Sequence, residues 1–294
     1  MQRLNAFTSG LVFVLAIAFS LVAQLVASFT LITTTDAVAK EFITICAVVA
    51  IQVCNLLAVV IVMRISKDEK DKLIHKPALT NSIWSVIVAL ITMVGFFSVS
   101  IMFSNALAGL GIGGSDIEYS GAVLVIFIID VVIIAPICEE LLFRYAMFTG
   151  FARDFSPVVA VIFSATAFVL YHMNAHQMIY QFAIGIMLSL VMYKTGNVLY
   201  CIFAHAISNT LALCIPSSIT VLVTQGWFVW IAIALAIGAI VASVFVVKAF
   251  KMEVGDKFAK TQGQGHSKAT SIILYSLAVF LCLIFIVSSF IPQA

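Results

Sequence analysis

The sequence predicts an all-α, polytopic transmembrane helical bundle of about nine spans. Hydrophobic residues make up 63% of the 294 residues and charged residues only 10%, with a mean hydropathy of +1.20. A soluble domain carries roughly a quarter charged residues, so this chain has too little polar surface to cover a globule in water. The apolar residues also fall in long runs, and the basic residues are distributed between these runs in a regular way.

Nine apolar runs reach or approach the roughly 20 residues that a helix needs to cross a bilayer. They are residues 7–33, 41–64, 81–106, 120–150, 156–173, 177–194, 197–215, 226–248 and 270–291. The first run is too long for the core of a signal peptide, and we interpret it as an uncleaved span. The fifth to seventh runs are short and closely spaced, so we expect them to form a tight helical cluster.

We expect three regions along the chain. Residues 1–118 form an N-terminal three-helix membrane region, 119–216 a core with the fourth to seventh spans, and 217–294 a C-terminal two-helix membrane region.

The basic residues predict the orientation of these spans. If the nine runs alternate in direction, thirteen of the fifteen Lys and Arg residues fall on one side, namely Arg3, the five of loop 64–76, Arg153, Lys194 and the five of loop 248–268. Lys40 falls on the other side, and Arg144 lies within a span. The positive-inside rule then predicts a cytoplasmic N-terminus and a C-terminus outside.

Ionisable side chains within the spans are concentrated in one region. Each costs about 2.5–3.5 kcal/mol on insertion scales, which makes each one a functional hypothesis by default. These residues are Asp130, Glu139, Glu140 and Arg144 in the fourth run, His172 in the fifth and His205 in the seventh. Their clustering indicates a polar site in the core.

Helix geometry gives the two adjacent glutamates different tasks. Side chains at Glu139 and Glu140 point about 100° apart. Glu140 and Arg144 are four apart in the favoured orientation for an ion pair, whereas Glu139 has no partner on its own helix. Asp130, nine residues before Glu139, faces nearly the opposite way, and we interpret it as a packing or pore-side residue.

A turn-like stretch at 151–157 lies midway between Glu139 and His172. Two antiparallel helices joined there place these side chains at equal depth, where they can bind and deprotonate one water. His205 and Asn209 share one helix face and can donate hydrogen bonds to an oxyanion.

Three sequence motifs carry a resemblance to a known family. The stretch Glu139–Arg144 (EELLFR) resembles the EExxxR motif of the CPBP family, Phe168–His172 its FxxxH motif and His205–Asn209 its HxxxN motif. The motifs occur in family order over residues 139–209. The CPBP family contains CAAX-processing and bacteriocin-processing intramembrane endopeptidases.

The resemblance implies that the chain hydrolyses a peptide bond within the membrane. It implies catalytic roles for Glu139, His172, His205 and Asn209, and supporting roles for Glu140 and Arg144. The implied partners are the lipid bilayer and a peptide or lipidated peptide, of the prenylated CAAX type or a small secreted peptide. No basic, aromatic-interleaved patch indicates binding to nucleic acid.

The family has also been described as metalloproteases, and the residues permit that alternative. His172 and His176 are four apart and could bind a divalent metal such as zinc together with His205 and Glu139. The zincin pattern, however, needs a glutamate directly after the first histidine, where this chain has Met173. We therefore favour glutamate chemistry without a metal.

Two other functions fit an intramembrane cluster of acids and histidines. A proton-coupled transporter also uses such residues, but the sequence shows neither paired halves nor Gly/Pro-broken helices. A catalytically silent relative acting as a membrane scaffold or immunity factor is the second alternative, and the intact motifs argue against it.

Overall fold

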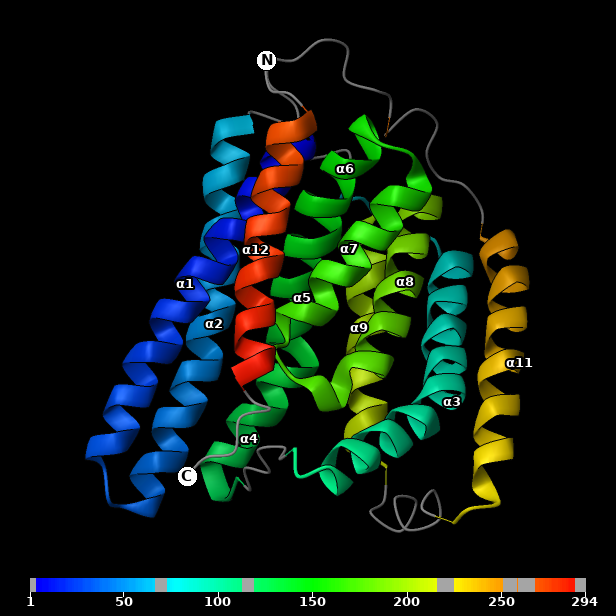
Figure 1. Ribbon diagram of the computed structural model, residues 1–294. Coiled ribbons are helices and arrows are strands. Elements are labelled where there is room, and N and C mark those ends of the chain that lie inside the picture. Colours follow the sequence, from blue (N-terminus) through cyan, green and yellow to red (C-terminus); the bar gives the residue numbers. More distant parts are fainter. Residues whose placement is uncertain are drawn as a thin grey trace.

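The computed structural model describes residues 4–66, 73–112, 119–215, 225–250, 258 and 268–288, and regular structure within them is helical throughout (Figure 1). This confirms the predicted all-α membrane bundle. Seven segments are long and apolar enough to cross a membrane: α1 (Ala6–Thr33), α2 (Ala37–Ser66), α3 (Leu79–Gly109), Gly121–Asp154, Ala175–Thr195, α11 (Phe228–Ala249) and α12 (Lys268–Ser288). Two shorter apolar helices are α7 (Pro157–Tyr171) and α9 (Val198–Leu213).

The N-terminus of α1 is fixed by polar contacts to the core. Asn5 caps the helix by accepting a hydrogen bond from the Thr8 amide, and Thr8 Oγ1 accepts one from the Asn5 amide in return. The Ala6 amide donates to Asp154 Oδ2 at 2.8 Å. A Cβ at Gly150 would lie 2.4 Å from the Asn5 carbonyl oxygen, so the chains approach closely here.

The fourth span is continuous but not a uniform α-helix, which corrects the regular geometry assumed from the sequence. It consists of α4 (Gly121–Ile129), the π-helical η2 (Asp130–Ile134), α5 (Ala135–Glu140), the π-helical η3 (Leu141–Phe148) and α6 (Thr149–Asp154). Pro136 at the start of α5 has no N–H for the helix ladder, and the wider π turn before it accommodates the proline.

The turn predicted at 151–157 is confirmed. The span ends at Asp154, Ser156 caps α7 by accepting from the Val159 amide, and Pro157 occupies the first helical turn. After α7 the chain turns through Met173, whose φ of 47° lies in the left-handed region. The 3₁₀ turn η4 (Ala175–Gln177) then leads into α8 (Met178–Thr195).

Helices α7 to α9 form the tight cluster expected from their short runs. The α8 residue Gly185 packs closely on α7, because a Cβ there would lie 3.2 Å from Ala165 Cα. With 15 and 16 residues, α7 and α9 are roughly 22 and 24 Å long, shorter than the roughly 30 Å hydrocarbon core.

Successive segments run in alternating directions (Figure 1). At one end, Asn197 Nδ2 donates to the His75 carbonyl and Arg153 to the Leu4 carbonyl. At the other end, Glu41 accepts from the amide and hydroxyl of Ser120. Most of the predicted inner basic residues, within 1–3, 67–72, 251–257 and 259–267, lie outside the described residues, and so do the predicted region boundaries at 118 and 216. The orientation and the three-region division therefore stay predictions.

Candidate active site

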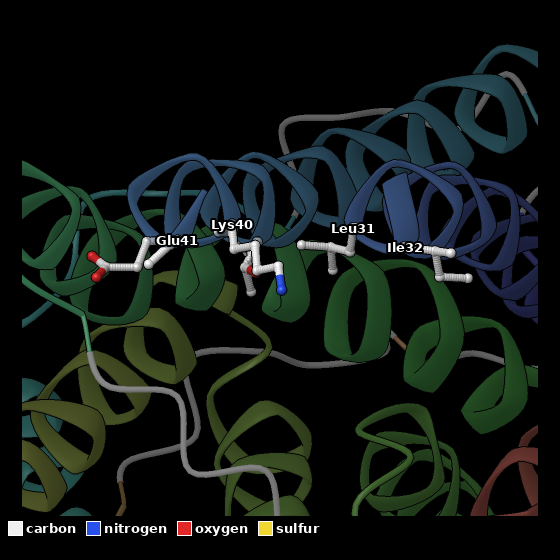
Figure 2. Close-up of a pocket in the computed structure, with 6 residues that line it drawn as sticks. Leu31, Ile32, Lys40 and Glu41 are labelled. Carbon is white, nitrogen blue, oxygen red and sulfur yellow. Dashed lines mark hydrogen bonds between the residues drawn. The ribbon is translucent and has the colours of Figure 1, made fainter. Parts of the chain in front are cut away.

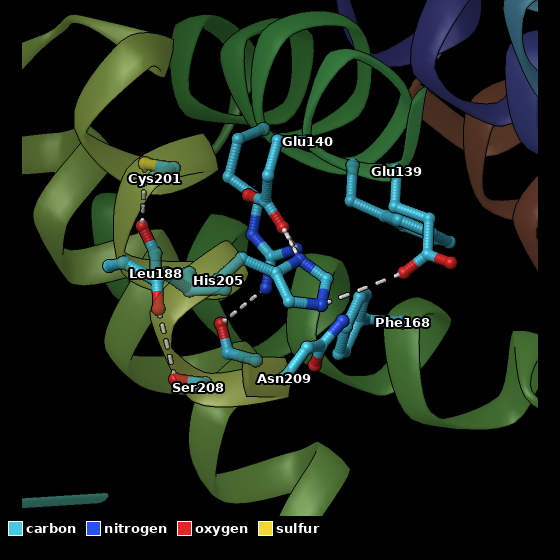
Figure 3. A network of polar contacts seen from close by, with 12 residues as sticks. Glu139, Glu140, Phe168, Leu188, Cys201, His205, Ser208 and Asn209 are labelled. Carbon is cyan, nitrogen blue, oxygen red and sulfur yellow. Dashed lines mark hydrogen bonds and ion pairs between the residues drawn. The ribbon is translucent and has the colours of Figure 1, made fainter. Parts of the chain in front are cut away.

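Three helical segments bring Glu139, His172 and His205 together in the core. Figure 3 shows Glu139 and Glu140 on either side of His205. The Glu139 Oε2 atom lies 3.9 Å from His172 Nε2 and 4.0 Å from His205 Nε2. Glu139 and His205 are buried, and His172, at the end of α7, is the most exposed of the three. The predicted approach of Glu139 and His172 across the 151–157 turn is confirmed.

Glu140 forms the predicted ion pair and also a contact that the sequence did not predict. Arg144 Nη1 lies 2.8 Å from Glu140 Oε1, with both side chains fully buried. The same oxygen lies 2.8 Å from His205 Nδ1. The two adjacent glutamates thus flank one imidazole, because their diverging side chains reach different nitrogens of the ring.

The Phe168 ring lies beneath this cluster. Its centroid is 4.5 Å from the Arg144 guanidinium carbon, a cation–π contact. It also meets the His172 and His205 rings edge-on, at centroid distances of 4.8 and 5.6 Å. Arg144 Nη2 donates in addition to the Gly185 carbonyl of α8. The phenylalanine of the FxxxH stretch therefore packs against both histidines and the arginine.

Asn209 lies one turn after His205 on α9, as predicted, and contacts the fourth span. Its Nδ2 donates to the Val131 carbonyl at 2.8 Å. In the π pattern a carbonyl accepts from the amide five residues later, and the Asp130 carbonyl accepts from the Ala135 amide in this way. The corresponding donor for the Val131 carbonyl would be residue 136, which is a proline and has no N–H. Asn209 therefore satisfies a carbonyl that the proline leaves without its ladder partner.

Asp130 is 1% exposed, which agrees with the packing role predicted for it. Its Oδ1 has no hydrogen-bond partner in the described part of the chain. The π turn η2 lies between Asp130 and Glu139 and changes the 3.6-residue phase on which the sequence argument relied.

The donor atoms do not fit a tetrahedral zinc site. No group of three His, Cys, Asp or Glu side chains among the described residues is placed to hold a metal ion. The donor separations of 3.9 and 4.0 Å exceed the about 3.4 Å that zinc bonds of 2.0–2.1 Å require. His176 contacts α3 instead, with its Nδ1 2.8 Å from Ser104 Oγ.

Sequence reasoning missed two residues of α2 that reach the site. Gln52 Nε2 donates to Glu139 Oε1 at 3.4 Å, and Asn55 Nδ2 donates to Gln52 Oε1 at 3.1 Å. The signal was present, because two amide side chains three residues apart interrupt the apolar run 41–64.

A shallow pocket lies far from this cluster, at the turn between α1 and α2 (Figure 2). Its lining residues are Leu31, Ile32, Ala37, Lys40, Glu41 and Thr44. None of them contributes to the candidate active site.

A family of known proteins matches part of this chain. Residues 121–211 match the family model described as Type II CAAX prenyl endopeptidase Rce1-like. This segment is similar to an Rce1-like domain. The match confirms the resemblance to the CPBP family, and the matched segment contains all three motifs.

The chain is also similar to an uncharacterized protein of Mycoplasma capricolum subsp. capricolum, at 34% identity over 93 residues. These residues are 30% of this chain and 27% of that protein, so the similarity spans about a quarter of the relative's length. No solved structure matches the chain.

Proposed function

We propose that this protein is an intramembrane endopeptidase that hydrolyses a peptide bond with a water activated by Glu139 and His172. The supporting observation is the convergence of Glu139 Oε2 with the Nε2 atoms of two histidines, at 3.9 and 4.0 Å. These distances are too long for direct hydrogen bonds. A water between the groups can bond to the carboxylate oxygen and to a histidine nitrogen.

The hydrogen-bond partners assign a proton to each imidazole. His172 Nδ1 lies 2.8 Å from the Phe168 carbonyl, and His205 Nδ1 lies 2.8 Å from Glu140 Oε1. Both partners accept, so each Nδ1 carries a proton. Each Nε2 then faces Glu139, where it accepts a hydrogen bond in the neutral ring and donates one in the charged ring.

His205 lies between two carboxylates, with Nε2 4.0 Å from Glu139 Oε2 and Nδ1 2.8 Å from Glu140 Oε1. With His205 and Arg144 as cations and Glu139 and Glu140 as anions, the four contacting groups sum to zero charge. A neutral sum lowers the free energy of burying charges in the low-dielectric core. His205 Nε2–H can then donate to an oxyanion, together with the second N–H of Asn209.

The reaction is a base-catalysed hydrolysis. Glu139 accepts a proton from water while the oxygen bonds to the peptide carbonyl carbon, and neutral His172 orients that water. The negative charge that develops on the carbonyl oxygen is stabilised by His205 and Asn209. The carbon–nitrogen bond then breaks, and the proton passes from Glu139 to the leaving nitrogen.

The substrate we propose is a peptide presented at the membrane, either a prenylated protein ending in a CAAX sequence or a small secreted peptide. The Rce1-like description of residues 121–211 supports the first class. Met173, directly after His172, has a left-handed backbone conformation, so the chain leaves the regular helix here. Non-helical backbone at membrane depth is tolerated only where it is buried in protein or lines a water-filled space.

Comparative membrane proteomics of wild type and Glu139→Gln tests this proposal. The variant is nearly isosteric and lacks the base, so an uncleaved precursor should accumulate in it and cleavage should fall about 10²–10⁴-fold. If purified wild-type protein in liposomes cleaves neither that precursor nor a farnesylated CAAX peptide, the proposal is wrong and the silent scaffold becomes the better explanation.

A further inference from the structure

We propose that a chain of side-chain hydrogen bonds from α1 and α2 holds Glu139 in position, and that Gln52 is the positioning residue that contacts it. This inference rests on the function proposed above. It extends the site beyond the three motifs, to helices that lie outside the segment matched by the family model.

The chain consists of four consecutive bonds between buried side chains. Ser20 Oγ lies 2.9 Å from Tyr171 Oη, and Tyr171 Oη donates to Asn55 Oδ1 at 2.6 Å. Asn55 Nδ2 donates to Gln52 Oε1 at 3.1 Å, and Gln52 Nε2 donates to Glu139 Oε1 at 3.4 Å. Ser20, Gln52, Asn55 and Tyr171 are each at most 8% exposed.

The direction of every bond follows from the bond between Gln52 and Glu139. An ionised Glu139 only accepts, so Gln52 must turn its NH₂ group toward it and its carbonyl oxygen toward Asn55. Asn55 then presents its own NH₂ to Gln52 and its oxygen to Tyr171, which must donate its O–H. Ser20 is therefore the donor to Tyr171. A reversal of either amide would bring like groups together.

All donors in the chain point toward the carboxylate. Hydrogen bonds aligned in this way polarise one another, which strengthens the bond that Gln52 donates to the carboxylate. The last bond is the longest, and catalytic hydrogen bonds are often long in the absence of substrate.

The chain of bonds explains how the Glu139 side chain is held in one orientation. Glu139 has no ion-pair partner on its own helix, and its side chain has several rotatable bonds. Gln52 holds Oε1, which leaves Oε2 directed at His172 and His205. Tyr171, which precedes His172 on α7, ties the same chain of bonds to the helix that carries the second catalytic residue.

The test compares Gln52→Met with Gln24→Met in liposomes, using a farnesylated CAAX peptide or the precursor found by proteomics. Methionine keeps the size of Gln52 and removes its N–H donor. Gln24 on α1 lies outside the chain of bonds, so its variant is the matched control. We expect kcat of Gln52→Met to fall about 10–100-fold with KM within about twofold, and Gln24→Met to keep both values.

A double variant separates positioning from general loosening. Tyr171→Phe removes one hydroxyl and should lower kcat less than Gln52→Met does. Combined with Gln52→Met it should cause no additional loss, because both changes break the same chain. If Gln52→Met does not fold, Tyr171→Phe alone must still lower kcat at constant KM.

Two outcomes contradict the inference in different ways. An unchanged kcat in Gln52→Met, or equal losses in Gln52→Met and Gln24→Met, overturns the positioning role and leaves the proposed function intact. A wild-type protein that cleaves neither peptide overturns both.

Discussion

At the scale of single residues, the site depends on carboxylate oxygens that serve more than one partner. Glu140 Oε1 accepts from Arg144 Nη1 and lies equally close to His205 Nδ1. Glu140 Oε2 and Arg144 Nε, both buried, have no hydrogen-bond partner in the described residues. One oxygen therefore connects the arginine on its own helix with a histidine on α9.

This sharing predicts that the two glutamates fail differently when substituted. Glu140→Gln leaves Arg144 buried and uncompensated, so folded yield should drop with a stability loss of about 3–5 kcal/mol. Arg144→Met in the same chain should recover part of the yield but not the rate, because His205 has still lost its carboxylate partner. Thermal unfolding in detergent and kcat check both effects.

Glu139→Gln is the reference for that comparison and should unfold near the wild-type temperature while losing cleavage. A stable but inactive Glu140→Gln, beside an active Glu139→Gln, would reverse the assignment of the two carboxylates.

Charge and spacing within one helix made part of the site predictable. The Glu140–Arg144 pair followed from a four-residue interval, and the approach of Glu139 to His172 followed from a turn midway between them. The Glu140–His205 contact joins residues 65 apart and the Gln52–Glu139 contact residues 87 apart. No local period encodes such pairs, so the two amides that interrupt the apolar run 41–64 did not show which residue they contact.

At the scale of helices, the fourth span shows where a fixed period fails. The sequence correctly predicted its existence, its approximate bounds and the turn after it. It did not predict η2, because a 3.6-residue period assumes an unbroken ladder, whereas Pro136 removes one donor. It did not predict η3 either. The resulting contact of Asn209 with Val131 could not be read from helical faces alone.

The docking of α1 on α6 can be tested with a matched pair of glycines. A Cβ at Gly150 would lie 2.1 Å from Ser9 Oγ and 2.4 Å from the Asn5 carbonyl oxygen, whereas a Cβ at Gly238 on α11 meets nothing within 4 Å. Gly150→Ala should therefore destabilise the protein by about 1–3 kcal/mol. Gly238→Ala should be neutral or slightly stabilising, by up to about 1 kcal/mol.

Thermal unfolding of both variants in the same detergent measures the difference. Equal melting temperatures for Gly150→Ala and wild type would show that α1 does not pack against α6 this closely.

At the scale of the whole molecule, the alternating segments agree with the distribution of basic residues. The loops 64–76 and 248–268 hold ten of the fifteen Lys and Arg residues. Cysteines placed there, as Lys70→Cys and Gly263→Cys in a Cys214→Ala background, should escape an impermeant thiol reagent on intact cells. The protein that keeps native Cys214 is the positive control, because this cysteine is exposed after the end of α9 and should react.

Efficient labelling of both loop cysteines on intact cells would reverse the predicted orientation. Labelling of one alone would mean that the number of crossings between the loops is odd.

Two short helices at the active site also have a consequence for the lipid around them. Because α7 and α9 fall roughly 6–8 Å short of a bilayer of about 30 Å, acyl chains beside them must compress or leave helix ends below the headgroups. Val158 and Phe203 face outward on these helices and would be in contact with such lipid. Cleavage should therefore be faster in liposomes of phospholipids with 14-carbon acyl chains than in liposomes with 22-carbon chains. Equal rates would argue against an effect of bilayer thickness. The bilayer would then be thinner beside the active-site helices than elsewhere around the protein.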